Sequence, residues 1–249
     1  MQLVVQDLIT DFKRAGKGKK VLILHGWGDS SAGWVQFSQN LAKHYDVTVL
    51  DLPGFGNTQP PRAAWGLDDY ASFVAAFTKK ANLQPYAVIG HSNGGAIAIR
   101  SLSLGLLKPE KLVLLASSGI RGEYNGRNKV LRLATKTGKL LATPLPESIK
   151  KKLRRKVYET VGSDMLVAEH LQETFKRVVT DDVRADAKTI TQPTLLVYGE
   201  KDPATPVRQA YVLRKLIAGS RLEILPGATH FVHLDRAAKV GQLVEGFLQ

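Results

Sequence analysis

The chain has 249 residues, of which 44% are hydrophobic and 23% are charged, and it contains no Cys. This length fits one large α/β domain or two small domains, and the absence of Cys excludes a disulfide framework, a Cys-ligated zinc or iron–sulfur site and a cysteine nucleophile. The 35 Lys and Arg outnumber the 22 Asp and Glu, which gives a net charge of +13. A charge of this sign suits nucleic acid, an anionic surface or an acidic partner, and also a basic protein with no such partner.

The N-terminal segment does not resemble a secretion signal, because Asp7 and Asp11 interrupt the apolar core that such a signal requires. No run reaches the roughly 18 uncharged apolar residues of a membrane-spanning helix. We therefore expect a cytoplasmic protein without a transmembrane segment.

Short apolar runs alternate with longer amphipathic patterns along most of the chain. The first twenty residues are compatible with an antiparallel hairpin at one edge of a sheet. Beyond them, runs rich in Val, Ile and Leu predict buried strands, and apolar residues spaced by three and four predict helices. In chain order, the expected strands are 21–24, 47–50, 86–89, 111–115, 194–198 and 221–225, and the expected helices are 34–45, 68–80, 94–107, 206–218 and 235–248. This alternation predicts an α/β fold with a mostly parallel central sheet and helices on both faces.

The alternation stops between Gly119 and about Ile190, where the sequence shows helical patterns and Gly and Pro residues but no convincing strand. A connection of this length is too long to be a plain loop. We therefore predict a core formed by residues 1–119 and 190–249, and a helical cap formed by residues 120–189 over one end of the sheet.

A glycine-rich motif follows the third expected strand. Residues 90–95 have the sequence Gly-His-Ser-Asn-Gly-Gly, which contains the pattern G-x-S-x-G between a strand and a helix. In that context a tight, strained turn presents the serine at the carboxyl end of the strand, next to a helix N-terminus that favours developing negative charge. We predict that Ser92 is a nucleophile; the alternative is a glycine-rich turn that packs a helix on the sheet.

A serine nucleophile needs a base, and the base needs an acid that orients it. Asp202 follows the fifth expected strand, and His230 follows the sixth. The order Ser, Asp, His and the positions beyond carboxyl strand ends are those expected for a hydrolase site on an open α/β sheet. We predict Asp202 as the acid and His230 as the base, with Glu200 as a rival for the acid and His233 as a structural histidine.

The loop after the first expected strand has the sequence Leu-His-Gly-Trp-Gly at residues 24–28. A tetrahedral acyl-transfer intermediate needs N–H donors about 2.7–3.1 Å from its oxyanion. We predict that the backbone N–H groups of Trp27 and Asn93 are these donors, with the Trp27 ring as a further pocket wall. The other substrate-pocket candidates are His25, Gly26, His91 and Phe231.

Five motifs together resemble those of the α/β-hydrolase family, over roughly residues 18–119 and 190–249. They are Leu-His-Gly-Trp-Gly at 24–28, Asp-Leu-Pro-Gly-Phe-Gly at 51–56, the Ser92 motif at 90–95, Gly-Glu-Lys-Asp at 199–202 and Ala-Thr-His-Phe at 228–231, all in family order. The resemblance implies a serine hydrolase that acts on small-molecule esters without a cofactor. Dehalogenases and epoxide hydrolases of the family use Asp as the nucleophile, and Ser92 argues against both.

Within the family, residues 25–28 and 51–56 are most similar to the carboxylesterases that cleave the methyl ester of pimeloyl-acyl carrier protein. The Ser92 motif differs, because His91 and Asn93 replace bulkier and apolar residues of those enzymes. Asp51 is interpreted as a structural residue that shapes the loop after it. Carbon–carbon bond hydrolases and cofactor-free perhydrolases share the triad and stay alternatives, as does a non-catalytic receptor on the same scaffold.

Other chemistry-bearing patterns are incomplete. The glycine-rich segments 26–31 and 54–59 lack the last Gly of a dinucleotide fingerprint, and the sequence has no Walker-type phosphate loop. His230 and His233 have the spacing of metal ligands but no third ligand near them in the sequence. We therefore expect neither a cofactor nor a metal.

Most of the net charge comes from one segment. Residues 120–156 contain twelve Lys and Arg and two Glu, which accounts for +10 of the +13. Ile149, Leu153 and Val157 recur at four-residue spacing, which predicts an amphipathic helix with its charged face outward. That face is either simply solvated or attracts an acidic carrier protein, an anionic surface or an anionic ester. Nucleic acid is the weakest candidate, because aromatic residues that could stack on bases are not interleaved with the charges. The residues of the charged face are Lys150, Lys151, Lys152, Arg154, Arg155 and Lys156.

If this basic patch attracts an acidic partner or substrate, the Michaelis constant or the partner's dissociation constant rises with ionic strength, because salt screens charges over about 10 Å at 0.1 M. Replacing the six basic residues with Gln should remove that dependence, measured as KM from about 50 to about 500 mM NaCl. Salt-insensitive kinetics of the unmodified protein would contradict the hypothesis.

Overall fold

An eight-stranded sheet runs through the part of the chain that the computed structural model describes, residues 1–121 and 169–249. Its strand order is β1-β2-β4-β3-β5-β6-β7-β8. The strands are β1 (Gln2–Val5), β2 (Leu8–Ala15), β3 (Lys20–Leu24), β4 (Asp46–Leu50), β5 (Ala87–His91), β6 (Lys111–Leu115), β7 (Thr194–Gly199) and β8 (Arg221–Leu225). The six strands expected after the hairpin are all confirmed, with ends that differ by at most two residues.

The sheet is parallel from β4 to β8 and antiparallel at one edge. β1 pairs antiparallel with β2, and β2 pairs antiparallel with β4. The other neighbours are parallel, with Leu24 of β3 opposite Gly90 of β5, and His91 opposite Leu115 of β6. This register brings the carboxyl ends of the parallel strands to one edge, where open α/β sheets carry their sites. The predicted mostly parallel sheet and its edge hairpin are confirmed.

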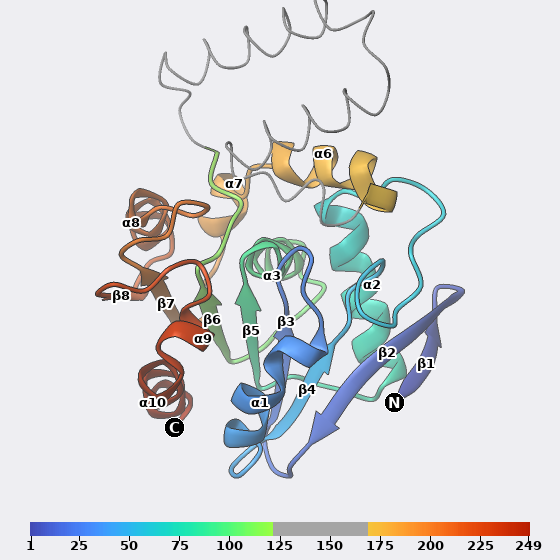
Figure 1. The fold of residues 1–249 in the computed structure, drawn as a ribbon, viewed down its shortest axis with the longest axis horizontal. Helices are drawn as coiled ribbons and strands as arrows, with labels where there is room; N and C mark the ends of the chain where they lie inside the picture. Colours follow the sequence, from blue (N-terminus) through green and yellow to red (C-terminus); the bar gives the residue numbers. More distant parts are fainter. Residues whose placement is uncertain (122–168) are drawn as a thin grey trace, which may run out of the picture.

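Helices cover both faces of the sheet (Figure 1). Because side chains alternate along a strand, Ile23 packs in a cluster with Trp34, whereas its neighbour Leu22 belongs to the opposite cluster with Phe73. Each such fully buried side chain contributes on the order of 1.5–3 kcal/mol. One face is covered by α1 (Val35–Leu41) and α10 (Ala237–Leu248), and the other by α2 (Leu67–Lys80), α3 (Asn93–Ser103) and α8 (Val207–Leu216).

Two expected helices are each preceded by a short helical turn. The helix expected over 34–45 is α1, which follows the 3₁₀ turn η1 (Ser31–Trp34) and ends at Leu41. The helix expected over 235–248 is α10, and Arg236, with φ −133° and ψ 44° outside the helical region, separates it from the short α9 (Val232–Asp235). The short α9 directly follows the loop that carries His230.

The predicted cap is described only in part. After β6, the structure describes η3 (Glu169–Leu171), α6 (Gln172–Thr180) and α7 (Arg184–Ala187), and residues 169–193 contain no strand. The ribbon view places α6 across the carboxyl ends of the strands (Figure 1). The N–H of Trp65 donates to Thr174 Oγ1 at 3.1 Å, and the N–H of Leu67 donates to Asp181 Oδ2 at 3.1 Å. The predicted basic patch at 150–156 lies outside the described residues, and the division into core and cap stays a prediction.

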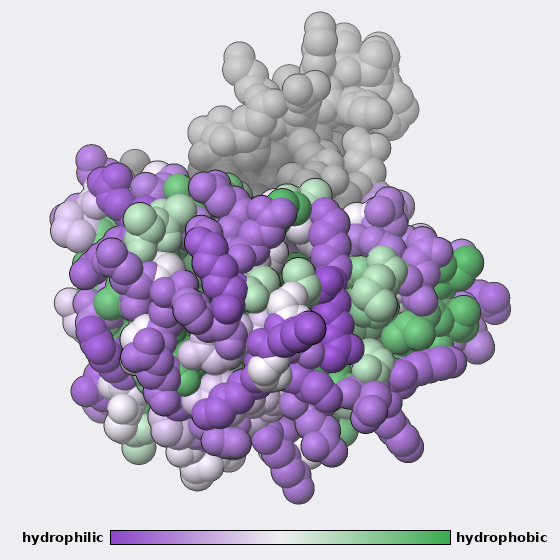
Figure 2. Space-filling view, turned by 90° about the horizontal axis from the view of Figure 1, so that it is seen from below, coloured by the Kyte–Doolittle hydropathy of each residue, from purple (hydrophilic) through white to green (hydrophobic). Residues whose placement is uncertain are grey.

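The face seen in Figure 2 is largely hydrophilic, with an apolar area on the side where Figure 1 places the N-terminal hairpin. Met1, Val4 and Ile9 are exposed hydrophobic side chains of that part of the chain. Within the described residues, no helix is long and apolar enough to cross a membrane.

Asp51 shapes the loop after β4, as expected from the sequence. It is 1% exposed, and its carboxylate accepts the N–H of Ser31 at 2.6 Å and the N–H of Asn57 at 3.0 Å. Gly56 has φ +56°, and a Cβ at that position would lie 2.1 Å from the Asp51 carboxylate. The buried charge is therefore satisfied by backbone donors from two loops.

Replacing Asp51 with Ala should lower the free energy of unfolding by about 2–4 kcal/mol, because two backbone donors lose a charged acceptor. Asp51→Asn should cost less, since its amide oxygen keeps one of the two bonds. Urea unfolding measures both, and Glu110→Ala, which removes an exposed carboxylate, is the matched control. A loss equal to that of the control would contradict this role.

Candidate active site

Ser92 lies on a strained turn between β5 and α3, with φ 50° and ψ −118°. Such a conformation costs a non-glycine residue on the order of 1–3 kcal/mol, so the surrounding structure must hold it. The N–H of Ser92 donates to the carbonyl of Leu115 at 3.1 Å, and the N–H of Ser118 donates to the carbonyl of Ser92 at 3.0 Å. The turn is thus anchored to the end of β6, and it presents a half-buried serine at the head of a helix.

Close backbone packing surrounds the turn. A Cβ at Gly94 would lie 2.2 Å from the carbonyl oxygen of Leu24, and one at Gly26 would lie 3.1 Å from Ser92 Cβ. Distances under 3.0 Å do not occur for real Cβ atoms, so α3 approaches β3 this closely only with Gly at position 94. The glycines of the motif therefore bring the loop after β3 against the turn at Ser92.

Asp202 and His230 form a hydrogen-bonded pair. His230 Nδ1 donates to Asp202 Oδ2 at 2.8 Å, and Asp202 is 5% exposed. Burial acts to raise the pKa of the Asp202 carboxyl, but hydrogen bonds from His230 and Thr205 outweigh burial and hold the pKa below its usual range. An ionised carboxylate on Nδ1–H leaves Nε2 as the basic nitrogen of His230.

Thr205 is a site residue that the sequence reasoning missed. Its hydroxyl donates to Asp202 Oδ2 at 2.6 Å and its oxygen lies 3.3 Å from His230 Nδ1. Asp202 Oδ1 also accepts the N–H groups of Ala204 and Thr205, at 2.8 and 2.9 Å. An Asp whose side chain accepts backbone N–H groups two and three residues on is an Asx-turn pattern, so Asp-Pro-Ala-Thr was the available signal.

Glu200, the rival acid, serves a different loop. Its side-chain oxygen accepts the N–H of Gly227 at 2.9 Å, and the residue is exposed. This contact fixes the turn after β8. The geometry therefore favours Asp202 as the partner of His230.

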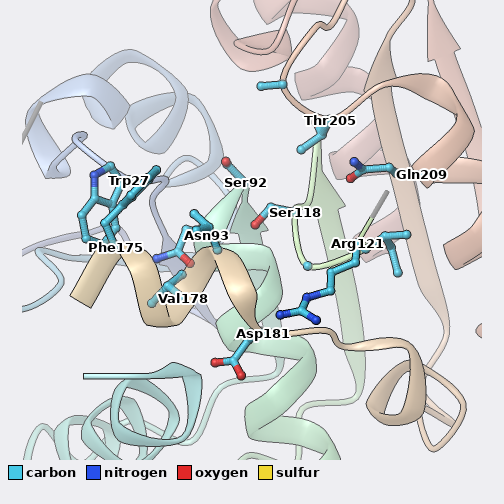
Figure 3. A pocket seen from close by; sticks show the side chains of 14 residues that line it. Trp27, Ser92, Asn93, Ser118, Arg121, Phe175, Val178, Asp181, Thr205 and Gln209 are labelled. Carbon is cyan, nitrogen blue, oxygen red and sulfur yellow. The ribbon is translucent and has the colours of Figure 1, made fainter. Parts of the chain in front are cut away.

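Ser92 lines a pocket of about 240 Å³, somewhat below the roughly 300–1,000 Å³ of typical ligand pockets. Figure 3 shows Ser92 between two groups of side chains. On one side lie the apolar Trp27, Phe175 and Val178 with Asn93; on the other lie Ser118, Thr205, Gln209 and Arg121, with Asp181 at the lower rim. The pocket therefore has one mainly apolar wall and one polar wall with a cation.

The two predicted oxyanion donors both border this pocket. Asn93 is the first residue of α3, so no helical carbonyl accepts its N–H. Among the described residues, the N–H of Trp27 also has no acceptor. The Trp27 ring packs against Phe55 at 4.8 Å and Phe175 at 5.1 Å between centroids, which fixes the loop that carries its N–H.

The remaining pocket candidates occupy other places. His25 and His91 are 0% and 1% exposed, so neither lines the pocket. His25 donates from Nδ1 to the carbonyl of Gly26 and accepts the N–H of Leu52 at Nε2, so it holds two loops together. Gly26 lies against the Ser92 turn, and Phe231 is 46% exposed on the surface. These four residues belong to motifs that lie near the site, but none of them forms part of the pocket wall.

Two buried histidines lie behind His230. His233 stacks on Trp34 with ring centroids 4.0 Å apart, and its ring lies 4.8 Å from that of His91. Burial lowers the pKa of His233 to about 4, and burial, followed by the neighbouring histidines, lowers the pKa of His91 well below its usual range. Both imidazoles are therefore neutral near pH 7. His233 is structural, as expected.

Comparison with known proteins gives a consistent family match. The family model described as alpha/beta hydrolase fold matches residues 19–237. A pimeloyl-[acyl-carrier protein] methyl ester esterase of Aeromonas salmonicida is 28% identical over 95% of this chain and 98% of its own length. A 2-hydroxy-6-oxo-2,4-heptadienoate hydrolase of Pseudomonas putida is 23% identical over 96% of this chain and 92% of its own. The enol-lactonase from Burkholderia xenovorans shares the fold, with a TM-score of 0.78 and 18% identity over 100% of this chain and 99% of its own.

The buried His233 makes stability depend on pH. Its pKa is about 4 in the folded state and about 6.5 when unfolded, so the unfolded chain binds the proton first as the pH falls. The stability that the neutral His233 contributes is fully present above pH 6.5. As the pH falls from 6.5 to 4, the free energy of unfolding decreases by about 1.4 kcal/mol per pH unit, or roughly 3 kcal/mol in all. Urea unfolding of the protein and of His233→Phe at both pH values should show a smaller loss in the variant; equal losses would contradict the assignment.

Proposed function

The chain belongs to the α/β-hydrolase family, and we propose that it is a serine hydrolase that cleaves carboxylic esters through an acyl-enzyme intermediate. The proposal rests on one observation above all: His230 donates to the buried Asp202 carboxylate at 2.8 Å, beside a pocket lined by a serine on a strained turn. A histidine whose ring is oriented by a carboxylate is the base that a serine hydroxyl needs.

In the proposed acylation step, Ser92 Oγ attacks the carbonyl carbon of the ester while His230 Nε2 takes its proton. The carbonyl oxygen becomes an oxyanion that the N–H groups of Trp27 and Asn93 bind. The tetrahedral intermediate then collapses: the bond to the alkoxy group breaks, His230 delivers its proton to the leaving alcohol, and the acyl group stays on Ser92.

Deacylation uses the same groups with water as the nucleophile. His230 removes a proton from water, the hydroxide attacks the acyl carbon, and the same two N–H groups bind the second oxyanion. Collapse returns the proton to Ser92 and releases the carboxylic acid. Asp202 stays ionised throughout and stabilises the charged form of His230, supported by Thr205.

The ester is favoured because a relative that matches over nearly its whole length is named as an ester hydrolase. Carbon–carbon bond hydrolysis is the second candidate, since another relative is named as the hydrolase of a carboxylate-bearing dienoate. Arg121 at the pocket wall would suit such an anion. Assaying 2-hydroxy-6-oxo-2,4-heptadienoate beside an ester, by loss of the dienoate absorbance, separates the two reactions.

An acidic carrier protein is the proposed macromolecular partner. The named esterase relative acts on an acyl group attached to a carrier protein. In this chain, +10 of the net charge lies in residues 120–156, and the first two residues of that segment, Ile120 and Arg121, line the pocket. Attraction of an acidic carrier to that segment would bring its acyl group to the pocket.

Ser92→Ala should lower kcat/KM on short-chain p-nitrophenyl esters by roughly 10⁴-fold or more, because no other group can form the acyl-enzyme. A fluorophosphonate should label the unmodified protein at Ser92, detected by mass spectrometry of the modified peptide, and should not label the variant. Ser72→Ala, which changes an exposed serine of α2, is the matched control.

Two results would refute the proposal. One is an unmodified, folded protein that neither turns over any ester of a chain-length series nor reacts with the fluorophosphonate, which favours a receptor on the hydrolase scaffold. The other is ester turnover that survives in Ser92→Ala.

A further inference from the structure

The side chain of His91 connects the two segments that carry the proposed nucleophile and base. His91 Nε2 lies 3.0 Å from the backbone carbonyl oxygen of His230. A carbonyl oxygen only accepts, so Nε2 carries the proton in this contact. His91 is also the covalent neighbour of Ser92. One hydrogen bond therefore ties the strained turn directly to the main chain of His230.

Other hydrogen bonds of the His230 loop lead elsewhere. The N–H and the hydroxyl of Thr229 both donate to Asp235 at 2.6 Å, which fixes the loop to α9. The N–H of Lys201 donates to the carbonyl of Ala228 at 2.8 Å, which fixes it to the loop after β7. Among the described residues, the bond from His91 is the one that joins the loop to the end of β5.

The ring of His91 is held in place on its other sides. It is 1% exposed, and its edge meets His233, which in turn stacks on Trp34 with an interplanar angle of 9°. Trp34 is itself fixed by donation from Nε1 to Asp29 at 2.9 Å. A Cβ at Gly26 would lie only 2.8 Å from His91 Nδ1, so the neighbouring backbone also closes that side. The imidazole has little room to turn away from the carbonyl.

The proton on His91 has a defined place. Burial keeps the pKa of His91 well below its usual range, so the ring is neutral and has a single N–H. That N–H is on Nε2, and Nδ1 has no partner among the described residues. His25 shows the opposite arrangement, because its Nδ1 donates and its Nε2 accepts. The two buried histidines are thus distinct tautomers.

We propose that His91 is a positioning residue, whose Nε2–H bond to the His230 carbonyl sets the separation between Ser92 Oγ and the His230 ring. This inference rests on the proposed function of Ser92 and His230. Proton transfer between them depends steeply on distance, and a misplacement of about 1 Å costs on the order of 10²-fold in rate. Because the His91 ring does not line the pocket, its loss should act on kcat and leave KM nearly unchanged.

The test uses the different reach of two amide side chains. The amide nitrogen of Gln extends about as far as His Nε2, whereas that of Asn extends only about as far as Nδ1. His91→Gln should retain kcat on a p-nitrophenyl ester within about threefold, and His91→Asn and His91→Leu should lose about tenfold or more, with KM within about twofold. His44, which is exposed on the turn after α1, provides the matched control pair, because His44→Gln and His44→Asn should behave alike.

Equal kcat values for His91→Gln and His91→Asn would overturn the proposal, as would a loss that appears mainly in KM. Should the variants fail to fold, the ring nitrogens of the unmodified protein provide the measurement, through two-bond ¹H–¹⁵N correlations. The expected result is a neutral His91 protonated at Nε2; a His91 protonated at Nδ1 overturns the inference. An unmodified protein with no ester turnover and no fluorophosphonate labelling refutes the proposed function instead, and the inference falls with it.

Discussion

The backbone of Ser92 is held at φ 50° in a conformation that an isolated chain would leave, and the surrounding packing compensates for its cost. Two hydrogen bonds anchor the turn to the end of β6, and Gly94 lets α3 press against the carbonyl of Leu24. A larger residue at position 94 would push α3 away from β3. The turn would then relax, and Ser92 would no longer lie above the sheet. Packing in the core thus determines whether the serine reaches the pocket at all.

The loops at the carboxyl end of the sheet are connected by hydrogen bonds to one another, in addition to the strands that carry them. Tyr198 in β7 donates to the carbonyl of Ser117 at 2.8 Å, which ties the end of β7 to the segment after β6. The N–H of Lys201 donates to the carbonyl of Ala228 at 2.8 Å, which ties the loop that carries Asp202 to the loop after β8. The bond from His91 to His230 joins β5 to the loop after β8. Residues 138 positions apart in the chain, Ser92 and His230, are therefore positioned by contacts between loops, because the sheet alone fixes only where each loop begins.

The sequence predicted the strands of the sheet and the end of the sheet at which the candidate site lies. Both predictions rest on local patterns, namely apolar runs and G-x-S-x-G between a strand and a helix. The sequence favoured Asp202 as the acid but left Glu200 as a rival, since both follow β7 and the path of the loop decides which carboxylate meets His230. The sequence also predicted His25 and His91 as pocket residues, but neither side chain lines the pocket. Position in a motif says nothing about which way a side chain points, and both imidazoles point into the scaffold. Likewise, the last helix begins at Ala237 and not at Asp235, because the backbone angles of Arg236 are not helical, which the apolar spacing does not reveal.

The residues proposed for the chemistry and the residues that line the pocket come from different stretches of chain. Ser92, Asp202 and His230 follow β5, β7 and β8, all in the core. Much of the pocket wall comes from the two ends of the segment between β6 and β7: Ser118, Ile120 and Arg121 before it, and Phe175, Val178 and Asp181 after it. Substitutions in these walls can change shape and charge without moving the Asp202–His230 pair, since none of the six side chains contacts that pair by a hydrogen bond in the described structure. The proposed Ser92, Asp202 and His230 arrangement could thus serve different substrates as the pocket wall changes, because a reaction class belongs to the site's chemistry and the choice of substrate belongs to the wall.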